Sequence, residues 1–314
     1  MRVITLANQK GGVAKTTSSL NIAYALANDW KQKVLLIDFD SQASATLDLG
    51  VDATDDKTRS IDELLDPYVA NISRRPTWDE IRPYILTPKF ISRERDPGNR
   101  MRWHDVERPY GFDLIPSSIN LSVTEMRMGV QASARGHRIY NSYLYDIIET
   151  ISQNRNYDYV VIDTPPALGT LSINAIRAAT AGVVIPTNLD IMSFRGITPL
   201  IESVESVQRS IGDEPHAGII GILLNLYSER RTIDRQLDDY LREFYPVHAF
   251  ETRVPESSDV KKANASNLLF AQVNKKASTA YKNIAGEIIY FNEHGELPWV
   301  ARQHAEKEAS NENE

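Results

Sequence analysis

Residues 3–7 read VITLA, and residues 10–17, a short step further along, read KGGVAKTT. The first run is apolar enough for a buried strand, and the second begins with a glycine pair and leads into a helical stretch. A strand that enters a glycine turn and then a helix gathers backbone N–H groups and a helix N-terminus around one point, which is the layout of a phosphate-binding loop. Lys15, directly before Thr16 and Thr17, stands where such a loop keeps its lysine. The pattern therefore predicts a phosphate site at the end of the first strand.

The loop departs from the strict G-x-x-x-x-G-K-[ST] pattern, because Gln9 and Ala14 occupy its two glycine positions. What it matches is K-G-G-x-x-K-T-T, with a second lysine, Lys10, at the start. Residues 7–17 thereby resemble the deviant Walker A loop of the ParA/Soj family of partition ATPases, within the ParA/MinD superfamily. The methyl group of Ala14 is tolerated if the backbone angle φ is negative there, so we expect the loop to keep its phosphate affinity.

The composition narrows the class of protein. The chain has 314 residues, with 42% hydrophobic and 25% charged content, which suits one large α/β domain. It contains no cysteine, which excludes a disulfide framework, a thiolate metal site and the cysteine-ligated cluster of a redox ATPase. No signal peptide fits before the first strand and no apolar run is long enough to span a membrane, so we expect a cytoplasmic protein. Because the net charge is −7, nucleic-acid binding would need a local basic patch.

Strand signals alternate with helical periodicity along the chain. Continuous apolar runs predict strands at residues 3–7, 33–38, 112–116, 157–163, 182–186 and 218–224. Helical periodicity predicts helices at residues 16–28 and near 137–151, 168–180, 193–210, 232–243 and 277–291. This alternation predicts an α/β fold, with a mostly parallel twisted sheet covered by helices on both faces. The resemblance implies the same fold, that of a P-loop NTPase of the deviant Walker A type.

We expect a single ATPase domain over residues 1–300. Residues 88–110 are rich in arginine and lack clear periodicity, so we predict a long loop insertion there. It either contacts an adaptor or DNA, or is an inert surface loop. Residues 301–314 are polar and acidic, which predicts a disordered tail.

Three aspartates stand at the carboxyl ends of two predicted strands. Asp38 ends the strand at residues 33–38, Asp40 follows it, and Asp163 ends the strand at residues 157–163. Ligands of parallel α/β sheets bind beyond the carboxyl ends of the strands, where the phosphate loop also falls. The sequence therefore predicts that these acids and the loop form one site.

The nucleotide-binding residues that we predict in the loop are Gly11, Gly12, Val13, Ala14, Lys15, Thr16 and Thr17. Lys15 is expected to reach the β- and γ-phosphates, and Thr16 to bind Mg²⁺ through its hydroxyl. The resemblance implies that Thr17 contacts the α-phosphate. It also implies that Lys10 crosses to the nucleotide of a partner subunit, so that two ATP molecules lie between the two chains of a homodimer and Lys10 acts catalytically in trans. A solvated surface lysine is the alternative for Lys10.

Two further segments resemble family motifs. Residues 34–46 resemble the Walker A′ segment, written DxDxQ. The resemblance implies that Asp40 positions and polarises the attacking water and that Asp38 belongs to the metal shell, the alternative being a capping aspartate at a strand end. Residues 160–166 match Walker B, which implies that Asp163 holds a metal-bound water.

Asn225 follows the strand at residues 218–224, near where related ATPases hold adenine. Its amide can donate to and accept from the adenine edge, or it can be a structural amide at the end of a strand. Both readings stay open at this point.

The resemblance extends beyond the nucleotide site. Residues 111–121 resemble the family segment LDLIPSNIDL, and residues 221–232 also align. It implies an ATP-driven switch for plasmid or chromosome partition, with ATP and Mg²⁺ as cofactors. ATP would join two subunits, the dimer would bind DNA nonspecifically, and a ParB-type centromere-binding adaptor would stimulate hydrolysis and release it. We accordingly expect a nucleoid-associated protein with no membrane partner.

The candidate DNA contacts are Arg230, Arg231, Arg235, Lys261 and Lys262. By alignment, Arg231 matches a DNA-contacting arginine of the family. Acidic residues interleave with these arginines, so solvated helix faces are the alternative reading.

Other functions within the superfamily remain as alternatives. A cargo-positioning ATPase on the nucleoid has the same chemistry. A MinD-like membrane cycle needs a basic amphipathic helix, usually at the C-terminus, whereas residues 301–314 are acidic. A metabolic ligase of the dethiobiotin-synthetase kind gives no reason for Lys10.

Overall fold

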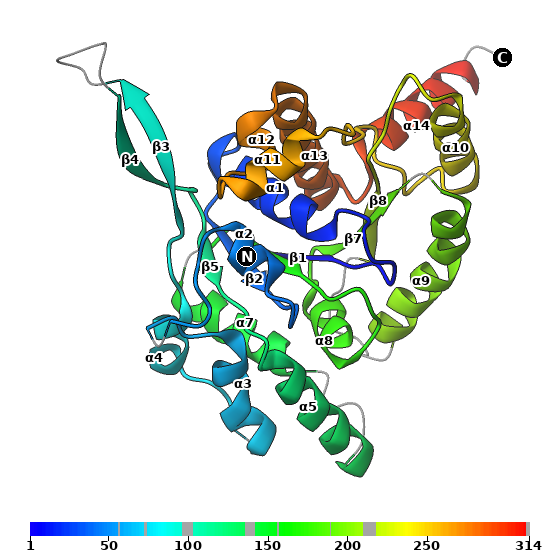
Figure 1. Cartoon of the computed structure of the whole chain (residues 1–314). Coiled ribbons are helices and arrows are strands. Elements are labelled where there is room, and N and C mark those ends of the chain that lie inside the picture. The colour runs from blue at the N-terminus through cyan, green and yellow to red at the C-terminus, as the bar shows by residue number, and fades with distance from the viewer. Residues whose placement is uncertain are drawn as a thin grey trace.

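The computed structural model describes the chain except for residues 56, 72–73, 96–102, 136–141, 156, 189, 210–217 and 312–314, and except for the side chains of residues 132–135, 191–195 and 307–311. A central sheet with helices on both faces makes up its body (Figure 1).

Six strands form this sheet in the order β5-β2-β6-β1-β7-β8, and every pairing within it is parallel. They are β1 (Arg2–Leu6), β2 (Val34–Asp38), β5 (Asp113–Ile115), β6 (Tyr159–Asp163), β7 (Gly182–Asn188) and β8 (Ile219–Asn225). Their side chains are almost all buried, as expected for strands covered on both faces. The predicted α/β fold is confirmed, and each predicted strand is present.

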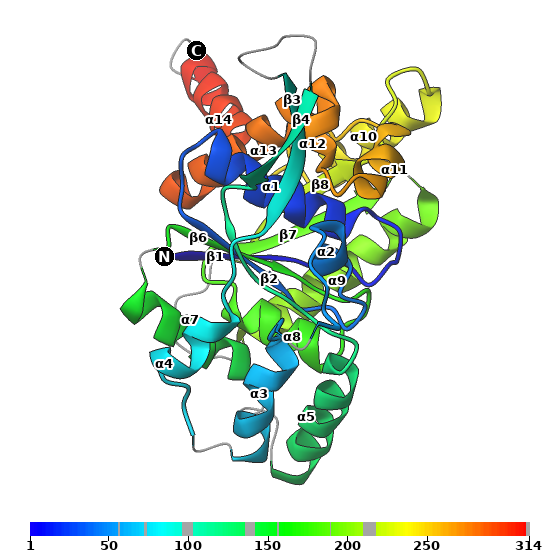
Figure 2. The same ribbon diagram turned by 60° about the vertical axis from the view of Figure 1, so that its left-hand side comes forward.

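The helices are α1 (Lys15–Asn28), α2 (Ser44–Asp48), α3 (Ile61–Ala70), α4 (Trp78–Ile81), α5 (Leu121–Arg135), α7 (Tyr143–Asn154), α8 (Thr170–Ala178), α9 (Ile191–Arg209), α10 (Thr232–Phe244), α11 (Asp259–Ala265), α12 (Phe270–Val273), α13 (Lys275–His294) and α14 (Pro298–Asn311). Figures 1 and 2 show α1 and α13 on one face of the sheet and α3, α5 and α7 on the other. Side chains alternate along each strand, so Leu36 packs in the first of these layers and Leu35 and Ile37 in the second. No helix in the described ranges has both the length and the apolar composition that crossing a bilayer needs.

The strand register brings the functional ends of three strands level. Leu6 of β1 and Asp38 of β2 are both paired with Asp163 of β6. The loop to α1 leaves from one of these ends, and two of the predicted acids stand at the others. The fold therefore places the phosphate loop beside Asp38 and Asp163, as the strand pattern predicted.

The predicted loop at residues 88–110 is wrong, because its described residues form an antiparallel hairpin. Strands β3 (Lys89–Arg95) and β4 (Trp103–Pro109) pair along their length and project from the body (Figures 1 and 2). Cross-strand contacts stabilise the pair: Lys89 forms an ion pair with Glu107 at 3.1 Å, and the Arg95 guanidinium lies 5.2 Å from the Trp103 ring centre. The hairpin was missed because both of its faces are largely polar, so no apolar alternation marks it. Residues 96–102, between the two strands, lie outside the described residues.

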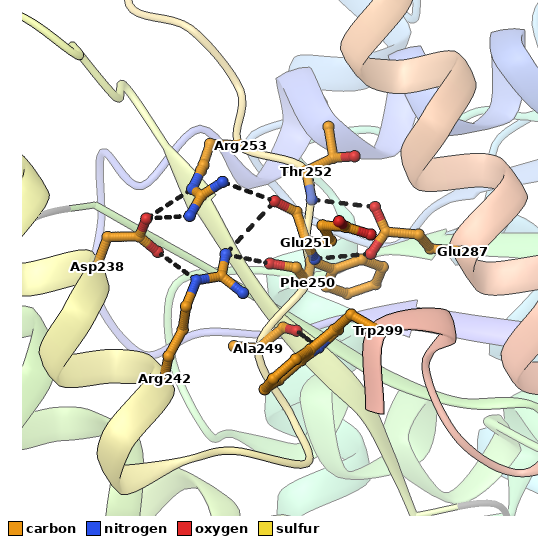
Figure 3. A network of polar contacts seen from close by, with 9 residues as sticks. All are labelled: Asp238, Arg242, Ala249, Phe250, Glu251, Thr252, Arg253, Glu287 and Trp299. Atoms are coloured by element: carbon orange, nitrogen blue, oxygen red, sulfur yellow. Dashed lines mark hydrogen bonds and ion pairs between the residues drawn. The ribbon is translucent and has the colours of Figure 1, made fainter. Parts of the chain in front are cut away.

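The predicted disordered tail at residues 301–314 is also wrong over its described part, since α14 continues through Asn311. The helix is anchored at its start by Trp299, whose indole N–H donates to the Ala249 carbonyl at 2.6 Å (Figure 3). Val300, which is buried, anchors it as well. Beyond this anchor come alanine, glutamate, lysine and glutamine, which are good helix formers. The polar residues after Val300 therefore continue a helix whose start is packed against the body of the protein. Residues 312–314 lie outside the described residues.

Candidate functional site

The loop between β1 and α1 is tied to the neighbouring strand. The Asn8 side chain donates to the Pro186 carbonyl of β7 at 2.7 Å and accepts from the Lys10 backbone N–H at 2.9 Å. Gly12 has a φ of +75°, and a Cβ added there would meet no described atom within 4 Å. Its backbone conformation, and not crowding, is what favours glycine at this position.

Ala14 precedes α1 with a φ of +60° and a ψ of +36°. The expectation of a negative φ was wrong, because the residue lies in the left-handed region, which costs a non-glycine residue about 1–2 kcal/mol. Its carbonyl accepts from the Ser18 N–H at 2.9 Å, the first hydrogen bond of the helix. The surrounding structure therefore holds Ala14 in a conformation that it does not favour by itself.

The loop lines a pocket of about 270 Å³ at the carboxyl edge of the sheet. The lining residues are Gly11, Gly12, Val13, Ala14, Lys15, Thr16, Thr17, Asp40, Gln42, Ser44 and Pro166. The structure thus brings together every loop residue predicted to bind nucleotide, together with Asp40. Lys15 is the first residue of α1 and is only 7% exposed, so its charge and the helix N-terminus act on the same small volume. Larger hollows lie around Asp113 and Arg155, near the starts of β5 and β6, but they contain no phosphate loop.

Asp38 and Asp163 form a fully buried carboxylate pair at the ends of adjacent strands. Burial, together with the charge of Asp163, raises the pKa of Asp38 to about 7, against the effect of hydrogen bonds from Thr46. Burial also raises the pKa of Asp163 to about 6, although the Lys15 ammonium and hydrogen bonds from Thr16 and Ser19 oppose the shift. Two carboxylates at adjacent strand ends repel each other when both are charged, and a nearby cation stabilises the charged forms. The Lys15 ammonium is such a cation for Asp163.

Asp163 has an oxygen available for a cation. Its Oδ1 accepts from the Ser19 hydroxyl at 2.8 Å, whereas its buried Oδ2 has no hydrogen-bond partner within the described part of the chain. Thr16 lines the same pocket and is close enough to this carboxylate to lower its pKa. A hydroxyl and a carboxylate oxygen beside a phosphate loop are the hard ligands that suit Mg²⁺.

Asp38 is less available than the sequence suggested. Its Oδ2 accepts from both the N–H and the hydroxyl of Thr46, at 2.8 and 2.7 Å, and its Oδ1 accepts from the Asp40 N–H at 3.3 Å. These bonds fix the loop that follows β2. The geometry therefore fits Thr16 and Asp163 as ligands and gives Asp38 a role in holding Asp40 in position.

Asp40 lies on the pocket wall and is 5% exposed. Its Oδ1 accepts from the Gln42 N–H at 3.0 Å, and its carbonyl accepts from the Ser117 hydroxyl at 2.7 Å. Ser117 also donates its N–H to the Thr46 hydroxyl at 2.9 Å, which joins the loop after β5 to helix α2. Sequence reasoning did not single out Ser117 or Thr46, although small hydroxyl residues just past strand ends are a usable signal. The arrangement holds a carboxylate where it can orient a water.

Asn225 holds the phosphate loop in position through buried hydrogen bonds. It is fully buried, and its amide donates to the Val13 carbonyl at 2.8 Å and to the Ser18 hydroxyl at 3.1 Å. The reading of Asn225 as an adenine contact is therefore corrected in favour of the structural one. Its amide holds the phosphate loop against the end of β8, and Asn225 is not among the residues that line the pocket.

Lys10 forms an ion pair with Asp190, two residues past the end of β7. Both side chains are partly exposed, and Lys10 is absent from the residues that line the pocket. We did not predict Asp190, although its place after a strand that ends at the same edge was a usable signal. In the structure, then, the second lysine is held beside its own pocket and not inside it.

The predicted DNA contacts cluster around the start of α10 and along α11. Arg231 forms ion pairs with Asp234 at 2.9 Å and Glu256 at 3.1 Å, and Lys262 forms one with Asp259 at 2.8 Å. The other candidates, Arg230, Arg235 and Lys261, are exposed. The structure therefore leaves the positive charge of Arg231 and Lys262 partly neutralised.

The comparisons with known proteins agree with this geometry. The family described as AAA domain matches residues 1–215. The chromosome partitioning protein ParA of Caulobacter vibrioides is 31% identical over 291 residues, which are 92% of this chain and 94% of that protein. Cobyrinic acid a,c-diamide synthase of Mycobacterium smegmatis, solved with an ATP analog and magnesium, has a TM-score of 0.66 at 24% identity and covers 95% of this chain and 98% of that one. Apo McdA of Cyanothece has a TM-score of 0.69 at 21% identity over 92% and 99% of the two chains, and both structural likenesses concern the fold.

Proposed function

This chain belongs to the ParA/MinD superfamily of ATPases, and we propose that it is a DNA-partition switch driven by ATP. ATP joins two copies into a dimer, the dimer binds DNA nonspecifically, and a ParB-type adaptor stimulates hydrolysis and releases it. The observation that carries this proposal is the position of Lys10, which stands at the nucleotide edge but outside its own pocket. A lysine in this position is placed to contact the phosphates of a nucleotide bound to a second copy of the chain.

ATP and Mg²⁺ fit the residues of the pocket. Lys15 and the N-terminus of α1 neutralise phosphate charge, and Thr16 and the available oxygen of Asp163 would hold the ion. When bound, Mg²⁺ supplies electrostatic stabilisation of the phosphate oxygens. Asp40 orients the water that attacks the γ-phosphorus, and the products are ADP and phosphate.

Lys10 must leave Asp190 before it reaches a partner nucleotide. The ion pair is partly exposed, so breaking it costs at most about 1 kcal/mol. Contact with the phosphates of the second ATP replaces it. Dimer formation is then coupled to ATP, because ADP lacks the γ-phosphate that Lys10 would contact.

Nonspecific DNA binding rests on Arg230, Arg231, Arg235, Lys261 and Lys262. These residues contact the phosphate backbone of DNA. Binding through phosphate contacts weakens steeply with salt because counterions are released. The association with the nucleoid follows from this binding.

The test is DNA binding in ATP, in ADP and without nucleotide, at two salt concentrations, for the wild type, Lys15→Ala and Asp40→Ala. We expect ATP to promote salt-sensitive binding, Asp40→Ala to keep it, and Lys15→Ala to lose it. Binding that ignores nucleotide or salt contradicts the partition switch. If the protein hydrolyses ATP but binds DNA in none of the samples, the ATPase activity stands and the cargo is something other than DNA.

We also propose that the β3–β4 hairpin contacts the adaptor or DNA. It projects from the body of the molecule and is joined to the start of β5, away from the pocket at the carboxyl edge (Figure 1). Replacing residues 91–107 by a short linker, which keeps the buried Tyr110 and the partly buried Phe90, should therefore spare basal hydrolysis and reduce its stimulation by adaptor and DNA. Unchanged stimulation would make the hairpin an inert surface element.

A further inference from the structure

Helix α10 buries two aspartates beside the core residue Leu241 and leaves large apolar residues exposed on another side. Asp234 and Asp238 are 2% and 3% exposed, whereas Ile233, Tyr240 and Phe244 are 51%, 44% and 56% exposed. A helix on the surface of a globular protein ordinarily does the reverse. The contacts that hold the two aspartates inside therefore decide which side of α10 faces outward.

Ion pairs hold the buried side of α10 in place (Figure 3). Asp238 pairs with Arg242 at 3.2 Å and with Arg253, whose Nε donates to it at 2.7 Å. The Arg242 guanidinium also donates to the Phe250 carbonyl at 3.0 Å and lies 5.6 Å from the Trp299 ring centre. Turning the helix to bury its apolar residues would separate Asp238 from Arg253 and Arg242 from the Phe250 carbonyl, which is strongly unfavourable for a buried carboxylate and a half-buried guanidinium. The structure therefore fixes the apolar side of α10 outward.

The apolar stripe of α10 consists of the exposed residues Ile233, Tyr240, Phe244 and, just past the helix, Val247, together with Leu237, which is partly buried against the core. The spacing of four, seven and eleven residues places the helical members on one side. The rings of Tyr240 and Phe244 stack with their centres 4.0 Å apart, which makes a firm surface. An exposed stripe with this spacing is the kind of surface that packs against another helix.

Acidic residues flank the stripe. Asp239 and Glu243 are exposed and stand four residues apart on α10, where like charges repel each other. Neither forms an ion pair with any lysine or arginine in the described ranges. A cation placed beside the stripe would relieve this repulsion.

We propose that the apolar stripe of α10 docks a basic amphipathic helix of a partner protein. The apolar side of that helix covers Tyr240 and Phe244, and its lysines or arginines meet Asp239 and Glu243. An anionic membrane fits poorly because both carboxylates would face its charge. An antiparallel contact with α10 of a second copy would set two acidic flanks side by side. The stripe shares no residue with the nucleotide pocket or with the five proposed DNA contacts, so its test does not depend on the outcome for the proposed function.

Two designed helical peptides of about 18 residues, which is five turns, test the proposal. Both carry the same leucine stripe, and the flanks are lysine in one and glutamate in the other. Binding to the full chain is measured by fluorescence anisotropy for the wild type, Phe244→Glu and the double variant Asp239→Lys with Glu243→Lys. Val130→Glu is the matched control, because Val130 on α5 is an apolar residue at least as exposed (64%) as Phe244 (56%). Urea unfolding and basal ATP hydrolysis check that each variant is folded.

We expect the lysine-flanked peptide to bind the wild type and Val130→Glu equally, and Phe244→Glu to bind it at least roughly tenfold more weakly. The double variant should prefer the glutamate-flanked peptide. The proposal is overturned if the peptide binds Phe244→Glu as well as the wild type, or if neither peptide binds. It is also overturned if Phe244→Glu abolishes a dimer of the free chain, or abolishes flotation with phosphatidylserine vesicles, because the occupant is then a second copy or a membrane.

Discussion

Replacing Ala14 with glycine tests whether the phosphate loop holds a strained residue before any ligand binds. The φ of Ala14 is +60°, a conformation that costs a non-glycine residue about 1–2 kcal/mol. Glycine removes this cost but loses about 0.4–1 kcal/mol more chain entropy on folding than alanine does. We therefore expect Ala14→Gly to raise the free energy of unfolding of the ligand-free protein by about 0.5–1 kcal/mol.

The assay is urea unfolding followed by circular dichroism, with Gly11 and Gly12 as matched positions in the same loop. A Cβ added at either would meet no described atom within 4 Å, but only Gly12 has a positive φ. Gly11→Ala should therefore stabilise the protein by about 0.4–1 kcal/mol through chain entropy alone. Gly12→Ala should destabilise it by about 0.5–1 kcal/mol, since the left-handed cost exceeds that gain.

One result would refute this reasoning. If Ala14→Gly destabilises the protein by as much as Gly11→Ala stabilises it, both changes report only chain entropy. The left-handed conformation at residue 14 would then be absent from the free loop. Equal denaturant slopes across the variants are needed for the comparison, because a changed slope indicates a changed unfolded or folded state.

Three further perturbations follow from contacts in the structure. Asn225→Ala leaves the Val13 carbonyl without its buried donor, so we expect about 1–3 kcal/mol lower stability in urea unfolding and weaker binding of a fluorescent nucleotide. Asp190→Asn releases Lys10 from its ion pair, so ATP-dependent dimerisation measured by sedimentation should strengthen by up to about fivefold; weaker dimerisation would mean that Asp190 itself contacts the partner. Burial raises the pKa of Asp48 to about 6, so the folded state favours the protonated acid, and that contribution to stability is lost as pH rises from about 4 to about 6. Asp48→Asn should therefore be more stable than the wild type at pH 8 and equal to it near pH 4, which thermal unfolding at both pH values will check.

The sheet and the phosphate loop could be predicted because their signals are local. Each buried parallel strand is a continuous apolar run, and such runs survive in the sequence without knowledge of their neighbours. The meeting of Asp38 and Asp163 followed from the rule that parallel strands end at one edge. The motif spacing around Lys15 then identified which edge carries the chemistry.

The misses share a different physical cause. The β3–β4 hairpin is stabilised by cross-strand pairs such as Lys89 with Glu107, which become visible only once the register is known. The start of α14 is fixed by Trp299 docking on Ala249, a contact across 50 residues. Asn225 looked like a ligand because a polar residue at a strand end has no visible partner in the sequence, whereas its partners lie in the loop at the other end of the chain.

Ion pairing within the chain also changes what salt dependence DNA binding should show. Five basic residues were predicted as DNA contacts from the sequence, but Arg231 and Lys262 already pair with aspartates or glutamates in the described structure. A residue that exchanges one anion for another releases fewer counterions than a solvated one. If only Arg230, Arg235 and Lys261 contribute, the logarithm of affinity should fall with the logarithm of salt at a slope of about 2.7 per subunit, against about 4.5 for all five. A slope near the larger value would mean that DNA draws Arg231 away from Asp234, and the start of α10 would then have to rearrange on binding.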